Sequence, residues 1–187
     1  MIRLFLIRHG EPQAAWGEAD DPGLSALGHA QARAAAAALP EGLAIWCSPM
    51  ARCRDTAAPY ETRSGVGARI EPRVSEVATP AGVPDRRVWL QENFPWRAGA
   101  GERAWPSLAP ELQRWRAQVI AAVCEATSDT AVFTHFIAIN ALVGAATGDS
   151  ATIVCRPNHA SITELALNAG TLRLIAMGES MHGGDVR

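Results

Sequence analysis

The sequence contains no lysine, because all 17 residues in its lysine-plus-arginine count are arginines. The P-loop of nucleotide hydrolases needs a lysine that reaches the nucleotide phosphates, so this class of protein is excluded. Catalysis through a lysine Schiff base is excluded for the same reason. Any fixed basic side chain that contacts an anion must be an arginine, whose planar guanidinium can hold two phosphate oxygens at once.

Cysteine is scarce, and its spacing excludes several kinds of site. The four cysteines form neither a Cys-x-x-Cys pair nor a zinc-finger pattern, so we expect small buried apolar residues rather than metal ligands. A cysteine-dependent phosphatase would need Cys-x5-Arg, but only four residues separate Cys47 from Arg52. The Gly-x-Ser-x-Gly motif of serine hydrolases is absent too. With no His-x-x-x-His spacing or carboxylate cluster, the sequence predicts neither a metal nor a cofactor.

Long hydrophobic runs are also absent. No stretch of about 18 uncharged apolar residues occurs, so no membrane span is expected. The first apolar run, residues 2–7, is too short for a signal peptide and leads into Arg8 without a small-residue cleavage site. The formal net charge of −2 argues against a general nucleic-acid binder or a binder of acidic membranes. We therefore expect a cytoplasmic protein with neither nucleic acid nor membrane as a partner.

Strand-like and helix-like patterns alternate along the chain of 187 residues. Short apolar runs predict strands, and apolar residues at helical spacing predict helices. The expected strands are residues 2–7, 43–47, 69–74 (the weakest pattern), 130–134, 161–167 and 172–177. The expected helices are residues 26–39, 49–62, 108–126 and 137–146, with Ser25 and Ser48 as N-caps of the first two and Pro49 at the first helical position of the second.

This order of elements predicts a three-layer α/β/α fold with a mostly parallel sheet. Residues 168–171 (NAGT) predict a tight turn, so the last two strands should form an antiparallel hairpin at one edge of the sheet. Residues 78–110 depart from the alternation and are rich in proline and tryptophan. We expect them to form an irregular or partly helical insertion in a single domain that spans residues 1–187.

Chemically capable side chains follow three separate strands. Arg8 and His9 follow the first strand, Arg52 lies at the start of the helix after the second, and His135 follows the strand at 130–134. In sheets of this kind, ligands bind beyond the carboxyl ends of the strands. A lone histidine after a strand is more often structural than catalytic, so the joint placement carries the argument. A neutral imidazole beside an arginine can attack phosphorus if a backbone carbonyl holds its other ring nitrogen.

Five short blocks of the sequence form a recognisable series. They are residues 6–11 (LIRHGE), 24–32 (LSALGHAQA), 48–57 (SPMARCRDTA), 74–76 (VSE) and 132–135 (VFTH). In these blocks, which occur in the same order as in the family and together cover most of the chain, the sequence resembles the histidine phosphatase superfamily, the phosphoglycerate mutase-like proteins with an Arg-His-Gly motif.

The resemblance implies a role for each matching residue. His9 would attack phosphorus and become phosphohistidine, while Arg8, Arg52 and His135 would hold the phosphate. Glu76 would donate a proton to the leaving oxygen and then help to activate water. A carboxylate near a bound phosphate should have a raised pKa, which suits an acid.

The substrate pocket should differ from that of other members. Phe136 stands where the family usually has glycine, and it should narrow the pocket or give it an apolar wall. The insertion should cover the site, and His159 should lie at the rim of the pocket. The insertion residues that could contact the non-phosphate part of a substrate, although packing or surface charge explains each one alone, are Arg86, Arg87, Trp89, Phe94, Trp96, Arg97 and Arg103.

The sequence thus predicts a metal-independent phosphatase that hydrolyses a phosphomonoester through a phosphohistidine on His9. A small-molecule ester is the expected partner, with a phosphoprotein as the alternative. A phosphoglycerate mutase-like phosphoryl transfer is a second hypothesis, although mutases of this family are longer. A third is a non-catalytic phosphate-binding regulatory module, which would not need both histidines and both arginines. Sugar phosphates, nucleotides, α-ribazole phosphate and phosphohistidine proteins all remain candidate substrates.

Overall fold

The computed structural model describes residues 1–14, 21–97 and 101–181, with one six-stranded sheet at the centre. Its strands are β1 (Ile2–Arg8), β2 (Ala44–Cys47), β3 (Arg69–Ile70), β4 (Thr130–Thr134), β5 (Ile162–Asn168) and β6 (Thr171–Ala176). They lie in the order β3-β2-β4-β1-β5-β6. Neighbours from β3 to β1 pair in parallel, whereas β5 is antiparallel to both β1 and β6. The expected mostly parallel sheet with an antiparallel hairpin edge is confirmed.

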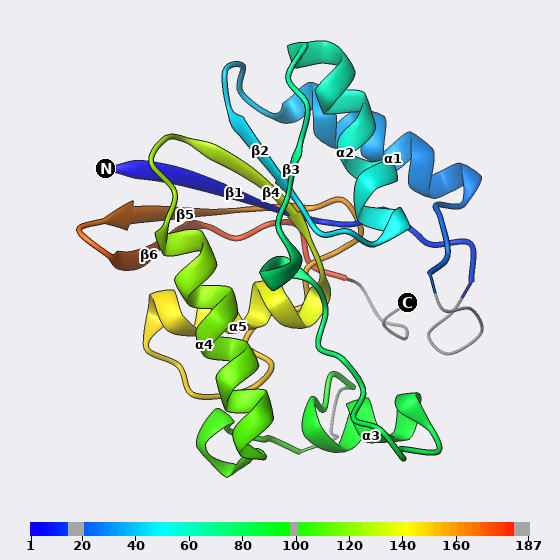
Figure 1. The fold of residues 1–187 in the computed structure, drawn as a ribbon, viewed down its shortest axis with the longest axis vertical. Coiled ribbons are helices and arrows are strands. Elements are labelled where there is room, and N and C mark those ends of the chain that lie inside the picture. Colours follow the sequence, from blue (N-terminus) through cyan, green and yellow to red (C-terminus); the bar gives the residue numbers. More distant parts are fainter. Residues whose placement is uncertain (15–20, 98–100, 182–187) are drawn as a thin grey trace.

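Helices cover both faces of the sheet (Figure 1). They are α1 (Ala26–Ala38), α2 (Ala51–Ser64), α3 (Arg86–Asn93), α4 (Pro110–Cys124) and α5 (Phe136–Thr147), with short 3-10 turns at Pro72–Val74 and Trp105–Ser107. The helices α1 and α2 pack on one face, and α4 and α5 pack on the other, which confirms the three layers. In the described part of the chain, no helix has the length and apolar character needed to cross a bilayer.

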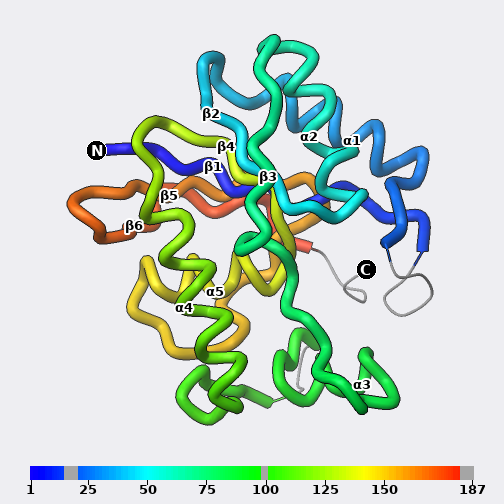
Figure 2. The backbone as a smooth tube through the Cα atoms, in the orientation of Figure 1, coloured from blue at the N-terminus to red at the C-terminus, as the bar shows by residue number. Residues whose placement is uncertain are grey.

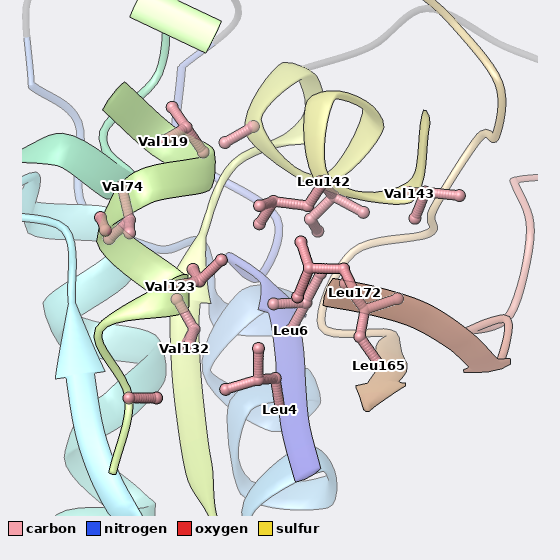
Figure 3. Packing of buried hydrophobic residues seen from close by; sticks show 14 of the residues in the cluster. Leu4, Leu6, Val74, Val119, Val123, Val132, Leu142, Val143, Leu165 and Leu172 are labelled. Atoms are coloured by element: carbon pink, nitrogen blue, oxygen red, sulfur yellow. The ribbon is translucent and has the colours of Figure 1, made fainter. Parts of the chain in front are cut away.

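The central strand β1 shows why the layers form. Alternate side chains of a strand point to opposite faces. Leu4 and Leu6 therefore join the apolar cluster under α4 and α5 (Figure 3), whereas Phe5 and Ile7 join the one under α1 and α2. Because both faces are covered, β1 is apolar along almost its whole length, and its carboxyl end opens directly onto the candidate site.

The start of α2 differs from the sequence prediction. Ser25 caps α1 through a hydrogen bond from the Gly28 N–H, as expected, but Ser48 does not cap α2. The N-cap of α2 is Met50, so Pro49 lies before the helix rather than at its first position. The first free N–H group of α2, on Ala51, donates to the Asp21 carboxylate at 2.8 Å. This distant carboxylate supplies the oxygen that a capping side chain normally provides.

The prediction of a strand at residues 69–74 is mostly wrong. Only Arg69 and Ile70 pair with β2. Pro72 has no N–H group to donate to a sheet, and it begins a 3-10 turn instead. The Glu71 carboxylate accepts the Arg73 N–H group and fixes this turn. The turn directs the chain away from the sheet and toward Glu76.

The segment expected to form an insertion, residues 78–110, contains α3, and its described residues share an apolar cluster with α4 and α5. In Figure 2 this segment lies at the end of the molecule where α4 begins. Phe94, Trp96 and Trp105 are almost completely buried in this cluster. Phe94 and Trp96 were named as possible substrate contacts, with packing as the simpler explanation, and both side chains are used for packing. Their burial explains how a proline-rich segment holds a defined shape.

Candidate active site

The imidazole of His9 is buried at the carboxyl end of β1, with 1% of its surface exposed. Its Nδ1 atom lies 2.8 Å from the Gly10 carbonyl oxygen. A carbonyl can only accept a hydrogen bond, so Nδ1 carries the proton of the neutral ring. The Nε2 atom therefore keeps its lone pair, which is the form that a nucleophile needs.

Backbone contacts hold the His9 segment in place. The His9 N–H group donates to the Thr134 carbonyl at 3.0 Å, and the Gly10 N–H group donates to Oγ1 of Thr56 at 2.9 Å. A Cβ atom on Gly10 would lie 2.6 Å from the Gly28 carbonyl oxygen, so only glycine allows this close approach to α1. His9, the candidate nucleophile, is therefore fixed at a junction between the sheet, α1 and α2.

The second imidazole, on His135, faces the first, with the two ring centroids 5.4 Å apart. Arg52 Nη2 lies 3.1 Å from Nδ1 of His135, and a guanidinium can only donate, so this nitrogen is the acceptor. The proton of the neutral ring must then lie on Nε2, which is 2.8 Å from Oγ of Ser48. The tautomer of His135 is the reverse of that of His9.

Ser48 is a site residue that the sequence analysis missed. Its side chain is fully buried and contacts His135 and, at 3.3 Å, the hydroxyl of Ser75. The serine-proline pair that begins the block at residues 48–57 is typical of a helix N-terminus, which concealed this role. Its position directly after β2, beside two other strand ends, was the signal that could have revealed it.

Two arginines lie beside the imidazoles and are almost completely buried. Arg8 Nη1 donates to the Pro157 carbonyl at 2.9 Å, and the Arg8 guanidinium lies 5.1 Å from the centroid of the Phe136 ring. Nη1 of Arg52 is 3.9 Å from the exposed carboxylate of Asp21. Among the described residues, Nε of Arg52 is buried and has no hydrogen-bond partner. This buried donor favours an anionic ligand at the site.

Burial and positive charge keep both imidazoles neutral. Burial lowers the pKa of His9 well below 6.5, and the charges of Arg52 and Arg8 lower it further. The same three causes lower the pKa of His135. At neutral pH both rings are therefore unprotonated on one nitrogen.

Glu76 is held at the first turn of α5. Its Oε2 atom accepts the Ile137 N–H group at 3.1 Å, and Oε1 accepts the Val77 N–H group at 3.3 Å. Burial raises the pKa of Glu76 above its ordinary value, although these hydrogen bonds and the charges of Arg86 and Arg52 oppose the shift. The result is a carboxyl group that can be protonated although cationic side chains lie near it.

The structure brings the five residues predicted as catalytic into one site: His9, His135, Arg8 and Arg52 are in contact or close to one another, and Glu76 interacts with the charges of both arginines. The half-buried ring of His159 lies 5.8 Å from that of His9.

The other two residues predicted for the substrate pocket, Phe136 and Trp89, pack against neighbouring side chains. Phe136 is fully buried under Arg8, so any effect that it has on a substrate acts through the guanidinium. Trp89 packs edge-on against Phe94 inside the insertion. Over residues 1–14, 21–97 and 101–181, no group of three or more histidine, cysteine or carboxylate side chains could hold a metal ion.

Comparison with known proteins gives a consistent result. A family model described as the histidine phosphatase superfamily, branch 1, matches residues 4–180. Similar solved structures include a mycobacterial glucosyl-3-phosphoglycerate phosphatase in complex with VO3, at 25% identity and a TM-score of 0.69, covering 96% of this chain and 100% of that one. A phosphoglycerate mutase from Thermus thermophilus has 20% identity and a TM-score of 0.61, covering 97% and 100%. No curated protein matches the sequence.

Proposed function

This chain belongs to branch 1 of the histidine phosphatase superfamily, and on that basis we propose that it hydrolyses a phosphomonoester through a phosphohistidine on His9. One observation carries the proposal: the buried imidazole of His9 is neutral, and the Gly10 carbonyl fixes its proton on Nδ1. The lone pair on Nε2 is therefore available to attack phosphorus, beside the donors that an anion requires.

The first step transfers the phosphoryl group to the enzyme. Nε2 of His9 forms a bond to phosphorus while the bond from phosphorus to the leaving oxygen breaks. Arg8 and Arg52 donate hydrogen bonds to the other phosphate oxygens and offset their charge, and His135 shares its Nε2–H group between Ser48 and the phosphate. Glu76 gives its proton to the leaving oxygen, so an alcohol departs and a carboxylate remains.

The second step returns the enzyme to its starting state. Water attacks phosphorus and loses a proton to the Glu76 carboxylate, while the bond from phosphorus to Nε2 breaks. Inorganic phosphate leaves, and His9 is again a neutral imidazole protonated on Nδ1. No metal takes part in either step, so EDTA should leave the activity unchanged.

A small phosphate ester is the proposed substrate class. A structurally similar mycobacterial protein is a glucosyl-3-phosphoglycerate phosphatase, which supports a metabolite as substrate. His159, half-buried 5.8 Å from the nucleophile, is proposed to contact the ester beyond its phosphate. Phe136 is proposed to act on the pocket through the Arg8 guanidinium above its ring, and a substrate contact by Trp89 stays a prediction. The cytoplasmic location and the lack of a nucleic-acid partner also remain predictions.

The proposal is tested with His9→Ala and an aryl phosphate such as p-nitrophenyl phosphate. Removing the nucleophile should lower kcat/KM at least about 10³-fold. His29→Ala is the matched control, because this histidine is exposed on α1, and it should keep full activity. Activity that survives in the His9 variant would overturn the mechanism.

The same assay separates the two alternatives. A mutase would return the phosphoryl group to an acceptor alcohol, so a labelled phosphate would appear in an isomeric ester rather than as inorganic phosphate. A regulatory module would bind phosphate or vanadate without turnover of any ester. Release of inorganic phosphate from a panel of phosphorylated metabolites would identify the preferred substrate.

A further inference from the structure

Arg86, the first residue of α3, reaches from the insertion toward the candidate catalytic acid. Its half-buried side chain donates through Nη2 to the Val77 carbonyl at 3.1 Å and through Nη1 to Oγ1 of Thr79. The Asp85 carboxylate caps α3 by accepting hydrogen bonds from the N–H groups of Arg87 and Val88. The backbone from which the Arg86 side chain extends is therefore fixed. The guanidinium therefore connects α3 to residues 77–79.

Val77 is the residue that links this contact to Glu76. Its N–H group donates to Oε1 of Glu76 at 3.3 Å, and its carbonyl accepts from Arg86. The Val77 side chain is 2% exposed and packs in the same apolar cluster as Leu90 of α3. Loss of the Arg86 contact would leave the peptide after Val77 free to rotate, and the Glu76 carboxyl group would move with it.

We propose that Arg86 is a positioning residue for the catalytic acid: it holds residues 77–79 so that the Glu76 carboxyl group stays against the phosphate-binding residues. The inference rests on the proposed function in that Glu76 is taken as the acid. It adds a role for a residue in the insertion, outside all the blocks that identify the family.

Charge acts together with this contact. The groups that face Glu76 are the guanidiniums of Arg8, Arg52 and Arg86, the N–H groups of Ile137 and Val77, and the thiol of Cys53. The Arg86 charge favours the ionised carboxylate, so it holds the pKa of Glu76 below the level that burial alone would give. Removing the Arg86 charge should raise the pKa of Glu76 further.

The test compares Arg86→Gln with Arg87→Gln, which removes the same charge from an exposed position on the same helix. The Glu76 carboxyl group is titrated by NMR with ¹³C-labelled glutamate, a measurement that does not depend on activity. In Arg86→Gln, Glu76 should titrate at higher pH than in the wild-type protein, and in Arg87→Gln it should not move.

Kinetics with p-nitrophenyl phosphate give a second readout. In Arg86→Gln, kcat should fall about tenfold because the acid is misplaced, while KM should stay within about twofold. The alkaline limb of the kcat profile should move to higher pH. Arg86→Lys restores the charge but cannot make both hydrogen bonds, so it should return the titration midpoint while kcat recovers only in part. The lysine variant also serves if the glutamine variant does not fold.

Two results would overturn the inference. One is an unchanged Glu76 titration in Arg86→Gln. The other is a raised KM with kcat unchanged, which would make Arg86 a substrate contact instead. If the wild-type protein hydrolyses no ester, the proposed function fails, but the NMR titration still decides whether the Arg86 charge acts on Glu76.

Discussion

At the scale of single residues, the chemistry depends on which nitrogen of each imidazole carries the proton. The Gly10 carbonyl places it on Nδ1 of His9, whereas Arg52 and Ser48 place it on Nε2 of His135. The two rings can therefore take different parts: one offers a lone pair, and the other offers a hydrogen bond. The arginines beside them stabilise this arrangement because both oppose a third positive charge.

The pH dependence should reflect these residues. The pKa of His9 is lowered and that of Glu76 is raised, so neutral His9 extends to lower pH and protonated Glu76 to higher pH than ordinary values would give, which widens the pH range of the active form. The pH profile of kcat/KM should show no acidic limb near pH 6.5, and Glu76→Gln should remove the alkaline limb. An acidic limb with a midpoint at or above the ordinary histidine value would contradict the proposed environment of His9.

Ser48→Ala should lower kcat/KM about tenfold, because a lost buried hydrogen bond of about 1–3 kcal/mol leaves His135 Nε2 without its acceptor. Ser64→Ala, at the end of α2, is the control and should change little. Steady-state kinetics with an aryl phosphate measure both. Equal activity of the two variants would show that Ser48 does not orient His135.

The sequence could identify the residues at strand ends but not the residues that hold them. His9, Arg52 and His135 follow apolar strands whose carboxyl ends must meet, so their convergence is predictable. Ser48 resembled a helix cap, but the N–H group of Ala51 is bound by Asp21, which lies 30 residues from Ala51 along the chain. Arg86 could not be distinguished from the other arginines of the insertion, because its role depends on where the chain turns after Val77.

At the scale of elements, the short segment between β3 and the candidate acid is held by charge. Glu71 is 3% exposed and binds Arg69 and Arg73, and Arg73 also binds Glu125 beyond the end of α4. Its hydrogen bond with Arg73 is the main cause that lowers the pKa of Glu71 to about 2. The turn that leads to Glu76 is thereby fixed on the helix layer.

Glu71→Gln should lower the free energy of unfolding at pH 7 by about 2 kcal/mol, the size expected for buried hydrogen bonds to a charged group. A depressed pKa stabilises the fold fully above the unfolded value of 4.5, and this stabilisation disappears as pH falls through about 2. The difference between variant and wild type should therefore shrink as pH falls from 5 to 2.

Urea unfolding across this pH range provides the measurement, with Glu41→Gln as the control because Glu41 is exposed. A difference that does not depend on pH would contradict the assignment.

The prediction of a strand at residues 69–74 was mostly wrong in this same segment. Sequence pattern alone does not reveal that the Glu71 side chain would bind the backbone of Arg73 and begin a turn.

At the scale of the whole molecule, the layers follow from the sequence and the insertion does not. β1 and β4 are apolar on both faces, which specifies a sheet that is covered on both sides. The segments with apolar residues at helical spacing predict the helices that cover it. The insertion is specified by contacts between distant residues. Trp105 stacks on Trp115 of α4, and Phe94 packs against Trp105. No local pattern contains these pairs, so only an irregular or partly helical segment could be predicted there.

The whole fold brings the site together from three strand ends, one helix and one insertion, and its central claim is that His9 carries the phosphoryl group. Wild-type protein and His9→Ala are mixed with an excess of labelled aryl phosphate and stopped during turnover in alkaline denaturant, which preserves phosphohistidine. Peptide mass spectrometry then locates the label. The account predicts one phosphoryl group on His9 in the wild type and none in the variant. Label on another residue, or turnover without any labelled protein, would contradict it.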